Sequence, residues 1–201
     1  MNVERRLGIL GGSFNPPHVG HLMIAADACA ILQLEKVVFI PAANPPHKAV
    51  EDDISAAVRL EMTRLAVSGN ERFEVSSVEI DGGLRYTLDT LAEIDRQCVG
   101  CRLFFILGSD SLMQFDTWHR PTAILKLCHL AVAPRPGDDL RTVEQEAARW
   151  GRDTVTVLPT TVVGVSSREI RRRVRVGGSI IYLVPEAVER YITEHRLYAA
   201  T

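Results

Sequence analysis

Two histidines in a short turn rich in glycine and proline are the residues of this chain best suited to chemistry. The segment Gly11–His21 reads GGSFNPPHVGH and places His18 and His21 soon after the apolar run Leu7–Leu10. Its glycines let the backbone approach a bulky ligand closely, and its two prolines stiffen the turn. A strand that ends in such a turn and leads into a helix offers backbone N–H groups and the positive end of the helix dipole to an anion. The segment therefore predicts a phosphate site.

The spacing separates this turn from the better-known phosphate-binding loops. No Gly-Lys-Ser/Thr follows, as a Walker A loop requires, and the G-x-G-x-x-G spacing of a dinucleotide-binding loop is absent. A single loop histidine is usually an ordinary surface residue. Two histidines inside one stiff turn after a strand favour the functional interpretation.

Other groups suited to chemistry follow later apolar runs. His47 and Lys48 come directly after a second Pro-Pro pair, which places a titratable donor and a cation on a stiff loop. The segment Gly108–Asp110 follows another apolar run and offers a carboxylate for ribose hydroxyls. Trp118 stands among polar residues and offers a flat ring for stacking, although a tryptophan in this setting is as often part of the core.

A basic helix is predicted near the end of the chain. Ser166 and Glu169 form a capping box, which marks a helix N-terminus. Four arginines follow at helical spacing on one face: Arg168, Arg171, Arg172 and Arg175. Like charges on one stripe repel each other unless water or an anion screens them, so the stripe is either a solvated basic face or part of a ligand site. We favour a phosphate at the helix N-terminus, bound by Ser166, Ser167 and one or two of the arginines.

The elements that must position these residues are predicted to alternate between strands and helices. Continuous short apolar runs are typical of strands that are buried on both faces of a parallel sheet. Strands are expected at Arg6–Leu10, Lys36–Pro41, Phe73–Glu79, Arg102–Leu107, His129–Pro134 and Thr154–Leu158. Helices are expected at Gly20–Gln33, Ser55–Ser68, Leu88–Arg96, Arg120–Lys126, Thr142–Trp150, Ser167–Val176 and Pro185–Arg196.

The predicted fold class is therefore α/β, a doubly wound, Rossmann-like parallel sheet with helices on both faces and a helical C-terminal segment. In such sheets, ligands bind outside the carboxyl ends of the strands. The glycine-rich turn, the loop with His47 and Lys48, and the segments Gly82–Thr87, Gly108–Asp110 and Val165–Arg171 all follow predicted strands. We expect them to line one rim and to form one site.

Length and charge narrow the class further. A chain of 201 residues is long enough to bury a sizeable core and is expected to form a single domain, residues 1–201. A net charge of −2 predicts no general attraction to nucleic acid or to a membrane. The longest apolar segment, Leu22–Leu34, contains Asp27 and is too short to cross a bilayer, and the first residues lack a secretory pattern. We expect a cytoplasmic protein with small-molecule substrates and no nucleic-acid or membrane partner, and the oligomeric state stays open.

The cysteines are Cys29, Cys98, Cys101 and Cys128. The pair Cys98 and Cys101 has the spacing of a redox or zinc motif. In redox sites such a pair opens a helix, whose dipole lowers the pKa of a thiol, whereas this pair precedes a predicted strand. A zinc ion would need two more ligands, and Cys128 with His129 is the nearby candidate pair. We therefore expect no redox or zinc function, and no disulfide or metal is required for folding.

Taken together, the motifs resemble those of the bacterial nicotinate-nucleotide adenylyltransferases. The H-x-G-H ending of the first turn is similar to the signature of the nucleotidylyltransferase superfamily, whose members catalyse attack on the α-phosphorus of a nucleoside triphosphate. The narrower motifs are P-P-H-K at Pro45–Lys48, Y-T-L-D-T-L at Tyr86–Leu91, G-S-D at Gly108–Asp110 with Trp118, and S-S-R-E-I-R at Ser166–Arg171. The resemblance spans nearly the whole chain. Three positions depart from the usual pattern: Asn15 stands where Asp is common, Leu84-Arg85 where Pro-Ser is common, and Arg168 where Thr is common.

The resemblance implies a role for each group. The catalytic residues would be His18, His21, Lys48 and Arg171. ATP would be bound by Gly11, Gly12, Ser13, Phe14, His18, His21, His47, Gly108, Ser109, Asp110, Ser166, Ser167, Arg168 and Arg171. The pyridine nucleotide would be bound by Asn44, Tyr86, Thr87, Asp110 and Trp118, with the Trp118 ring stacked on the pyridine. No side chains are expected to hold a metal, because Mg²⁺ would be carried mainly by the ATP phosphates.

The reaction implied is in-line attack by the phosphate of nicotinate mononucleotide on the α-phosphorus of ATP, which releases pyrophosphate and forms nicotinate adenine dinucleotide for NAD biosynthesis. The alternatives are an adenylyltransferase that acts on phosphopantetheine or nicotinamide mononucleotide, and a nucleotide-binding module without catalytic activity.

Overall fold

The computed structural model describes residues 4–43, 54–161 and 163–200, which fold around a parallel sheet in the order β3-β2-β1-β4-β5-β6. The strands are β1 (Arg5–Gly12), β2 (Lys36–Pro41), β3 (Phe73–Val75), β4 (Cys101–Gly108), β5 (Cys128–Ala133) and β6 (Val155–Val157). Every strand pair is parallel. The strand order reverses between β1 and β4, so the predicted doubly wound sheet is confirmed and its switch point lies between these two strands.

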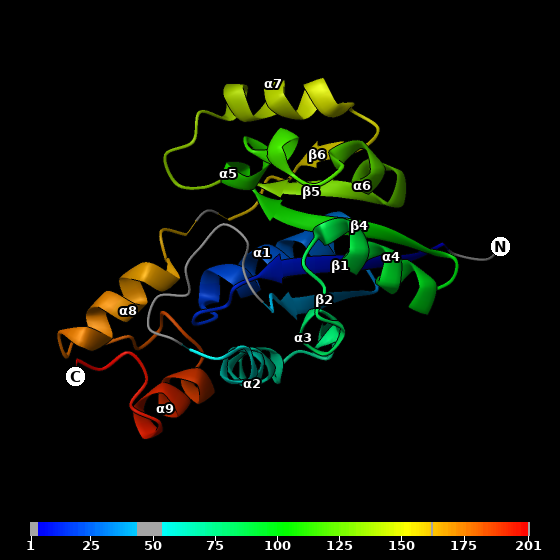
Figure 1. The fold of residues 1–201 in the computed structure, drawn as a ribbon. Coiled ribbons are helices and arrows are strands. Elements are labelled where there is room, and N and C mark those ends of the chain that lie inside the picture. Colours follow the sequence, from blue (N-terminus) through cyan, green and yellow to red (C-terminus); the bar gives the residue numbers. More distant parts are fainter. Residues whose placement is uncertain (1–3, 44–53, 162, 201) are drawn as a thin grey trace.

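Helices cover both faces of this sheet (Figure 1). They are α1 (Val19–Ile31), α2 (Ala56–Val67), α3 (Val78–Gly82), α4 (Thr87–Gln97), α5 (Ser109–Leu112), α6 (Pro121–Leu127), α7 (Leu140–Trp150), α8 (Ser167–Arg175) and α9 (Glu186–Glu194). Among the described residues, no helix is long and apolar enough to cross a membrane.

Neighbouring residues of a central strand belong to opposite hydrophobic cores. Ile9 of β1 packs in a cluster with Leu91 of α4 and Ile124 of α6. Leu10, the next residue, belongs to a second cluster with Ala25 and Ala28 of α1. Successive side chains of a strand point to opposite faces, and both faces are covered here, so the strand must be apolar at every position. This is why the central strands are continuous apolar runs in the sequence.

The predicted helical C-terminal segment is also confirmed, and it forms a third core beside α2. Ile170 of α8, Val188 and Ile192 of α9, and Met62 of α2 are buried together. Figure 1 shows these three helices grouped at one end of the molecule. That end is the one toward which the strands point, so the C-terminal helices lie next to the predicted ligand site.

The third strand is shorter in the structure than the sequence predicts. Only Phe73–Val75 pair with β2, and the expected continuation to Glu79 is wrong because α3 begins at Val78. Two serines end the strand: Ser76 Oγ accepts the Val78 N–H at 3.3 Å, and Ser77 Oγ donates to the Asp81 carboxylate at 2.5 Å. Serine side chains that bond the local backbone favour helix starts over strands. The short helices α3 and α5 were absent from the prediction.

The Cys98 and Cys101 side chains form a disulfide across the turn between α4 and β4. Cys29 and Cys128 are buried free thiols. The disulfide closes a very short loop, because its cysteines are three residues apart in sequence. Loop-closure entropy grows with loop length, so this bond constrains the unfolded chain only weakly.

Replacing both Cys98 and Cys101 with Ser is expected to leave the fold and the catalytic rate unchanged. The free energy of unfolding should fall by at most about 2 kcal/mol, the loop-entropy value for so short a loop. Urea unfolding of the double variant and of the native protein, each with and without reductant, measures this. Loss of activity in the folded double variant would contradict the expectation.

Candidate active site

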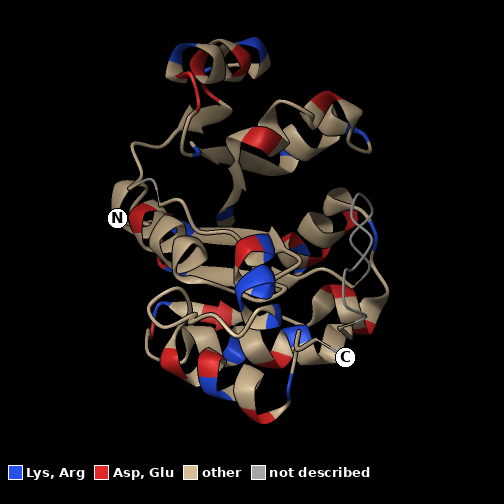
Figure 2. Cartoon of the chain, turned by 90° about the vertical axis from the view of Figure 1, so that its left-hand side faces the viewer, with Lys and Arg blue, Asp and Glu red and all other residues tan. Residues whose placement is uncertain are grey.

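The glycine-rich turn lies at the switch point between β1 and β4, where an open parallel sheet has its natural crevice. β1 ends at Gly12, and α1 begins at Val19. Figure 2 views the molecule from this end, where basic and acidic residues are interspersed along the chain. Because neither sign of charge dominates this view, an anion site here has to come from local groups.

Side chains from α8 hold the carbonyl groups of the turn. Ser167 Oγ donates a hydrogen bond to the Pro16 carbonyl at 2.8 Å, and Arg171 Nη1 donates to the Asn15 carbonyl, also at 2.8 Å. Arg171 is buried, so its guanidinium is part of the packing under the turn. The predicted proximity of Ser167 and Arg171 to the first turn is thereby confirmed, while their contact with phosphate stays a prediction.

The turn has two further partners from distant parts of the chain. Arg59 of α2 donates from Nη1 to the Ser13 carbonyl at 2.8 Å. The Tyr198 hydroxyl, close to the C-terminus, donates to Asn15 Oδ1 at 2.6 Å. Each carbonyl oxygen that accepts one of these hydrogen bonds faces a protein donor and not the open side of the site.

The two histidines of the turn stack on each other. The ring centroids of His18 and His21 are 3.7 Å apart, and the ring planes differ by 26°. The His18 backbone N–H donates to His21 Nδ1 at 3.2 Å, which fixes the orientation of the second ring. Phe14 packs edge-on against His21 with centroids 5.0 Å apart. Gly20 completes the motif, because a Cβ at this position would lie only 3.1 Å from His18 Nδ1.

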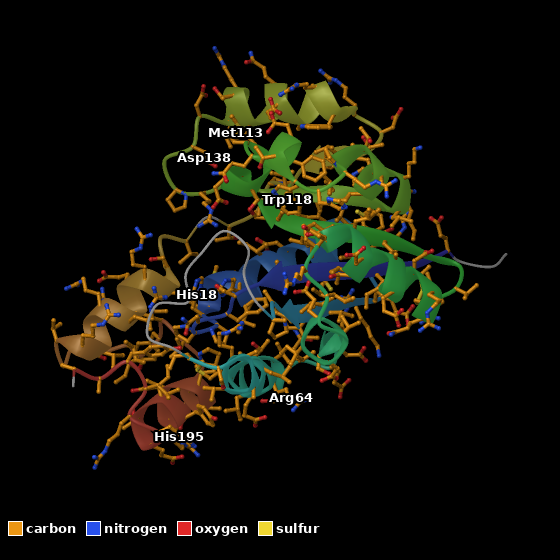
Figure 3. All side chains as sticks on the ribbon, in the orientation of Figure 1. His18, Arg64, Met113, Trp118, Asp138 and His195 are labelled. Carbon is orange, nitrogen blue, oxygen red and sulfur yellow. A yellow bond between two sulfur atoms is a disulfide. The ribbon has the colours of Figure 1, made fainter. Side chains whose placement is uncertain are left out.

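His18 is 8% exposed and lies at the carboxyl ends of the strands (Figure 3). Its Nδ1 is buried. Burial lowers the pKa of His18 from 6.5 to about 4, and the positive charge of Arg135 adds to this effect. The imidazole is therefore neutral at neutral pH in the ligand-free protein.

A cavity of about 780 Å³ opens beside the turn and gathers most of the residues predicted to bind the pyridine nucleotide. The predicted site residues in its wall are Gly11, Gly12, Ser13, Tyr86, Thr87, Asp110 and Trp118. Trp118 packs edge-on against Phe105 and Phe115, with centroids 6.0 and 5.3 Å apart. The ring is thus held by the core and also borders the cavity, which combines the two predicted roles of this tryptophan.

The mouth of the cavity carries a second aromatic pair. Tyr86 is 46% exposed and stacks on His119 with ring centroids 4.2 Å apart. Tyr86 is also the N-cap of α4, and Thr87 is its first helical residue, one position earlier than predicted. The first N–H groups of a helix lack partners within the helix, so this end of α4 presents donors at the cavity wall. Arg85 and Arg120 line the same cavity.

Asp110 is tied to a residue that the sequence analysis missed. Arg135 Nε donates to Asp110 Oδ1 at 2.8 Å, and the same arginine acts on His18. Gly108 makes room for this pair, because a Cβ at this position would lie 2.5 Å from Asp110 Oδ1. Arg135 lies two residues after the end of β5, on the same rim as the other site loops. This position just after a strand is the signal in the sequence that could have identified it as a site residue.

The predicted arginine stripe of α8 is divided between two environments. Arg171 is buried under the turn, whereas Arg168, Arg172 and Arg175 are exposed. Arg172 and Arg173 bind the Glu169 carboxylate and lower its pKa to about 2. Ser166 Oγ accepts the Glu169 N–H at 3.2 Å, which confirms the predicted helix start. Arg171 thus belongs to the packing of the turn and Arg172 to an ion pair with Glu169, while contact of the exposed arginines with phosphate stays a prediction.

Three predicted site residues, Asn44, His47 and Lys48, lie outside the described residues. Ser109 is buried at the start of α5, and Gly108 ends β4, both at the rim as expected. Within the described ranges, no group of three or more His, Cys, Asp or Glu side chains is arranged to hold a metal ion.

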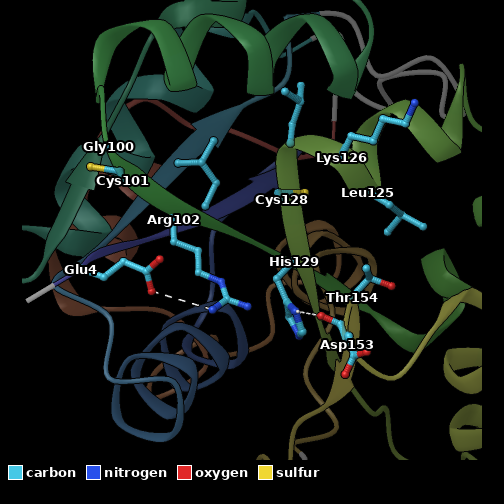
Figure 4. Close-up of a pocket in the computed structure, with 12 residues that line it drawn as sticks. Glu4, Gly100, Cys101, Arg102, Leu125, Lys126, Cys128, His129, Asp153 and Thr154 are labelled. Carbon is cyan, nitrogen blue, oxygen red and sulfur yellow. Dashed lines mark hydrogen bonds and ion pairs between the residues drawn. The ribbon is translucent and has the colours of Figure 1, made fainter.

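A second cavity, of about 470 Å³, lies at the amino ends of β4 and β5 (Figure 4). Its polar groups satisfy one another: Arg102 pairs with Glu4 at 3.8 Å, and His129 Nδ1 lies 3.2 Å from the Asp153 carbonyl oxygen. It also lies at the opposite end of the strands from the glycine-rich turn. This cavity carries none of the predicted site residues.

Comparison with known proteins agrees with this geometry. Residues 9–173 match the cytidylyltransferase-like family. A probable nicotinate-nucleotide adenylyltransferase from Citrifermentans bemidjiense is 43% identical, over 96% of this chain and 98% of that protein. One from Exiguobacterium sibiricum is 44% identical, over 96% of this chain and 99% of that protein. This chain belongs to the nicotinate-nucleotide adenylyltransferase family.

Solved structures share the family fold at low sequence identity. The nicotinic acid mononucleotide adenylyltransferase of Plasmodium falciparum, complexed with NaAD, superposes with a TM-score of 0.78 at 15% identity and covers 96% of this chain and 97% of its own. A putative nicotinate-nucleotide adenylyltransferase from Vibrio parahaemolyticus gives a TM-score of 0.71, also at 15% identity, over 98% of this chain and 97% of its own. At this identity the likeness establishes the fold.

His18→Gln is expected to change how stability depends on pH. The pKa of His18 is about 4 in the folded chain and 6.5 in a solvated one, so between these pH values the unfolded chain binds more protons. Native stability therefore falls as pH drops through this window and is unaffected by His18 above it. At pH 4 the native protein should lose about 3 kcal/mol more than the variant, relative to pH 7.

Urea unfolding from pH 7 to pH 4 measures this difference, with His195→Gln as the control at an exposed histidine outside the site (Figure 3). Equal pH dependence of the native protein and His18→Gln would show that His18 is not desolvated.

Proposed function

We propose that this chain transfers the adenylyl group of MgATP to nicotinate mononucleotide and releases pyrophosphate. The observation that carries the proposal is that Gly11, Gly12 and Ser13, which begin the turn that carries the two histidines, line the same cavity as Trp118, Tyr86 and Thr87. The first part suits phosphate and the second suits a flat ring with an anionic substituent. The names of the relatives and the NaAD complex of the Plasmodium protein support the same reaction.

On the ATP side, the chain supplies positioning and donors. The phosphate of a mononucleotide is already ionised near neutral pH, so little general-base chemistry is needed and catalysis comes from alignment and charge stabilisation. The N–H groups of the turn and the imidazoles of His18 and His21 face charge that builds up on the phosphates during transfer. An incoming triphosphate also opposes the effect of Arg135 on His18, so bound ATP favours the protonated imidazole.

Mg²⁺ enters as part of the MgATP substrate. Described residues of the chain do not converge on a metal site. Mg²⁺ commonly keeps several waters and binds through substrate phosphates, so the proposed reaction needs no metal cage of protein side chains.

On the pyridine side, the cavity favours a carboxylate over an amide. The N-terminus of α4 meets the cavity at Tyr86 and Thr87, and Arg85 and Arg120 line it as well. A nicotinate carboxylate accepts charge-assisted hydrogen bonds from such donors, whereas a nicotinamide would turn its own N–H₂ toward them. Trp118, held by Phe105 and Phe115, provides the face on which the ring stacks.

Pyrophosphate release from MgATP is the direct test of the proposed reaction. Turnover is expected with nicotinate mononucleotide and not with phosphopantetheine. The ratio of kcat/KM for nicotinate over nicotinamide mononucleotide should be at least about tenfold, the value of one charge-assisted hydrogen bond of about 1.5 kcal/mol. Equal turnover with phosphopantetheine would refute the assigned substrate, and ATP binding without turnover on any of these acceptors would refute catalysis.

His21→Ala is expected to lower kcat by about 10²–10³ with a smaller change in KM, because it removes a donor whose contact strengthens in the transition state. It also removes the acceptor of the His18 N–H. Steady-state kinetics and circular dichroism of the same preparation measure the effect. A loss below about tenfold in folded protein would make His21 a structural residue.

A further inference from the structure

A buried arginine and a partly buried glutamate meet the same short piece of backbone, at the point where the chain leaves β2. Arg59 of α2 is 1% exposed, and its Nη2 donates to the carbonyls of Ala42 and Ala43 at 2.7 and 3.2 Å. The other terminal nitrogen, Nη1, donates to the Ser13 carbonyl in the glycine-rich turn. One guanidinium group therefore bridges two loops that are 29 residues or more apart in the chain.

Glu79 of α3 holds the same backbone from the other side. Its carboxylate accepts a hydrogen bond from Thr90 Oγ1 of α4 at 2.9 Å, and the backbone N–H of Ala43 is close enough to favour its charged form. The Ala42 N–H in turn donates to the Gly12 carbonyl at 2.9 Å. The segment Ala42–Ala43 is thus fixed to α2, α3 and the glycine-rich turn at once.

Such an arrangement is costly to bury. Burial lowers the pKa of Arg59 and raises that of Glu79, so each charge is less well solvated than it would be in water. In the described part of the chain, no carboxylate lies within salt-bridge distance of Arg59, and its polar partners are backbone carbonyls. An apolar residue of similar size would fill the same space without this penalty. The specific gain is geometric, because a forked guanidinium fixes several acceptors in one plane.

The segments that this pair fixes are walls of the candidate site. Gly12, Ser13, Ala42, Glu79 and Thr90 all line the large cavity, whereas the Arg59 guanidinium lies behind it. We propose that Arg59 and Glu79 are positioning residues for adenylyl transfer, which fix the distance between the glycine-rich turn and the end of β2 and so align the two substrates. This rests on the proposed function. Neither residue touches the reacting atoms.

Arg59→Met tests the proposal, because methionine fills the volume and removes all donors. The expected result is a fall in kcat of about 100-fold, the effect of displacing reacting groups by about 1 Å, with KM changed by less than about threefold. Arg59→Lys keeps the charge but loses the fork, so its kcat should be intermediate. The control is Arg64→Met on the outer side of α2, where the side chain is exposed and pairs with Glu61 at 3.7 Å (Figure 3). Its kcat should be unchanged.

Glu79 is tested by two variants of similar size. Glu79→Gln keeps an oxygen that can accept the Ala43 N–H, whereas Glu79→Leu does not. The kcat of Glu79→Leu should fall at least about tenfold below that of Glu79→Gln. All rates are measured well below the melting temperature of each variant, so that a loss of folded protein does not contribute.

A second measurement is independent of catalysis. Amide hydrogen exchange at Ala42 and Ala43 should be faster in Arg59→Met than in the native protein, and unchanged in Arg64→Met. Faster exchange together with the loss of kcat supports the proposal. A folded Arg59→Met variant with native kcat overturns it, and so does native exchange at both alanines. If Arg59→Met does not fold, native kcat in Arg59→Lys together with equal kcat in the two Glu79 variants overturns it. An inactive native protein would instead refute the proposed function, and the exchange rates would then decide the structural part alone.

Discussion

The hydrogen bonds that bury carbonyl groups of the glycine-rich turn are the interactions on which the rest of this site depends. A turn can bind an anion through its N–H groups only if its carbonyl oxygens point elsewhere. Here, three side chains donate hydrogen bonds to carbonyls of the turn: Arg59 to Ser13, Arg171 to Asn15, and Ser167 to Pro16. The donors come from α2 and α8, which is why these helices must pack at the carboxyl end of the sheet. Two of the donors are cations, and they add positive potential behind the turn.

Electrostatics at the turn therefore come from fixed donors and buried guanidinium groups more than from charged imidazoles. His18 is stacked on His21, closed in by Gly20 and neutral in the ligand-free protein. A neutral imidazole avoids repulsion with Arg135 in the ligand-free protein. The positive charge of the site thus lies on the buried guanidinium groups of Arg59 and Arg171, which bond to backbone carbonyls. The imidazole of His18 is the group that can gain a proton.

The sequence predicted most of the fold because local signals and tertiary environment agree there. Buried strands must be apolar at every position, and this signal survives in a single sequence. It failed at Ser76 and Ser77, where Ser76 Oγ accepts the Val78 N–H and Ser77 Oγ donates to the Asp81 carboxylate, and these local bonds favour a helix over continued pairing. The site was predictable where a motif is continuous, as in the glycine-rich turn. Arg59, Glu79 and Arg135 were not, because each is an ordinary charged residue in its local sequence and acts only through loops brought together by the sheet. The same holds for the difference between Arg171 and Arg172, which are neighbours in sequence and in opposite environments in the fold.

The hydrogen bond between Tyr198 and Asn15 links positions separated by 183 residues. A growing chain emerges from the ribosome with its first strand and the glycine-rich turn long before Tyr198 has been made, and α9 must dock before the contact can form. This hydrogen bond of the turn therefore depends on a segment that is made after α9. A contact between residues so far apart in sequence has a high loop-closure cost, and the packing of α9 against α2 in the third core brings the two segments together. A residue beyond α9 thus helps to hold the glycine-rich turn that follows β1.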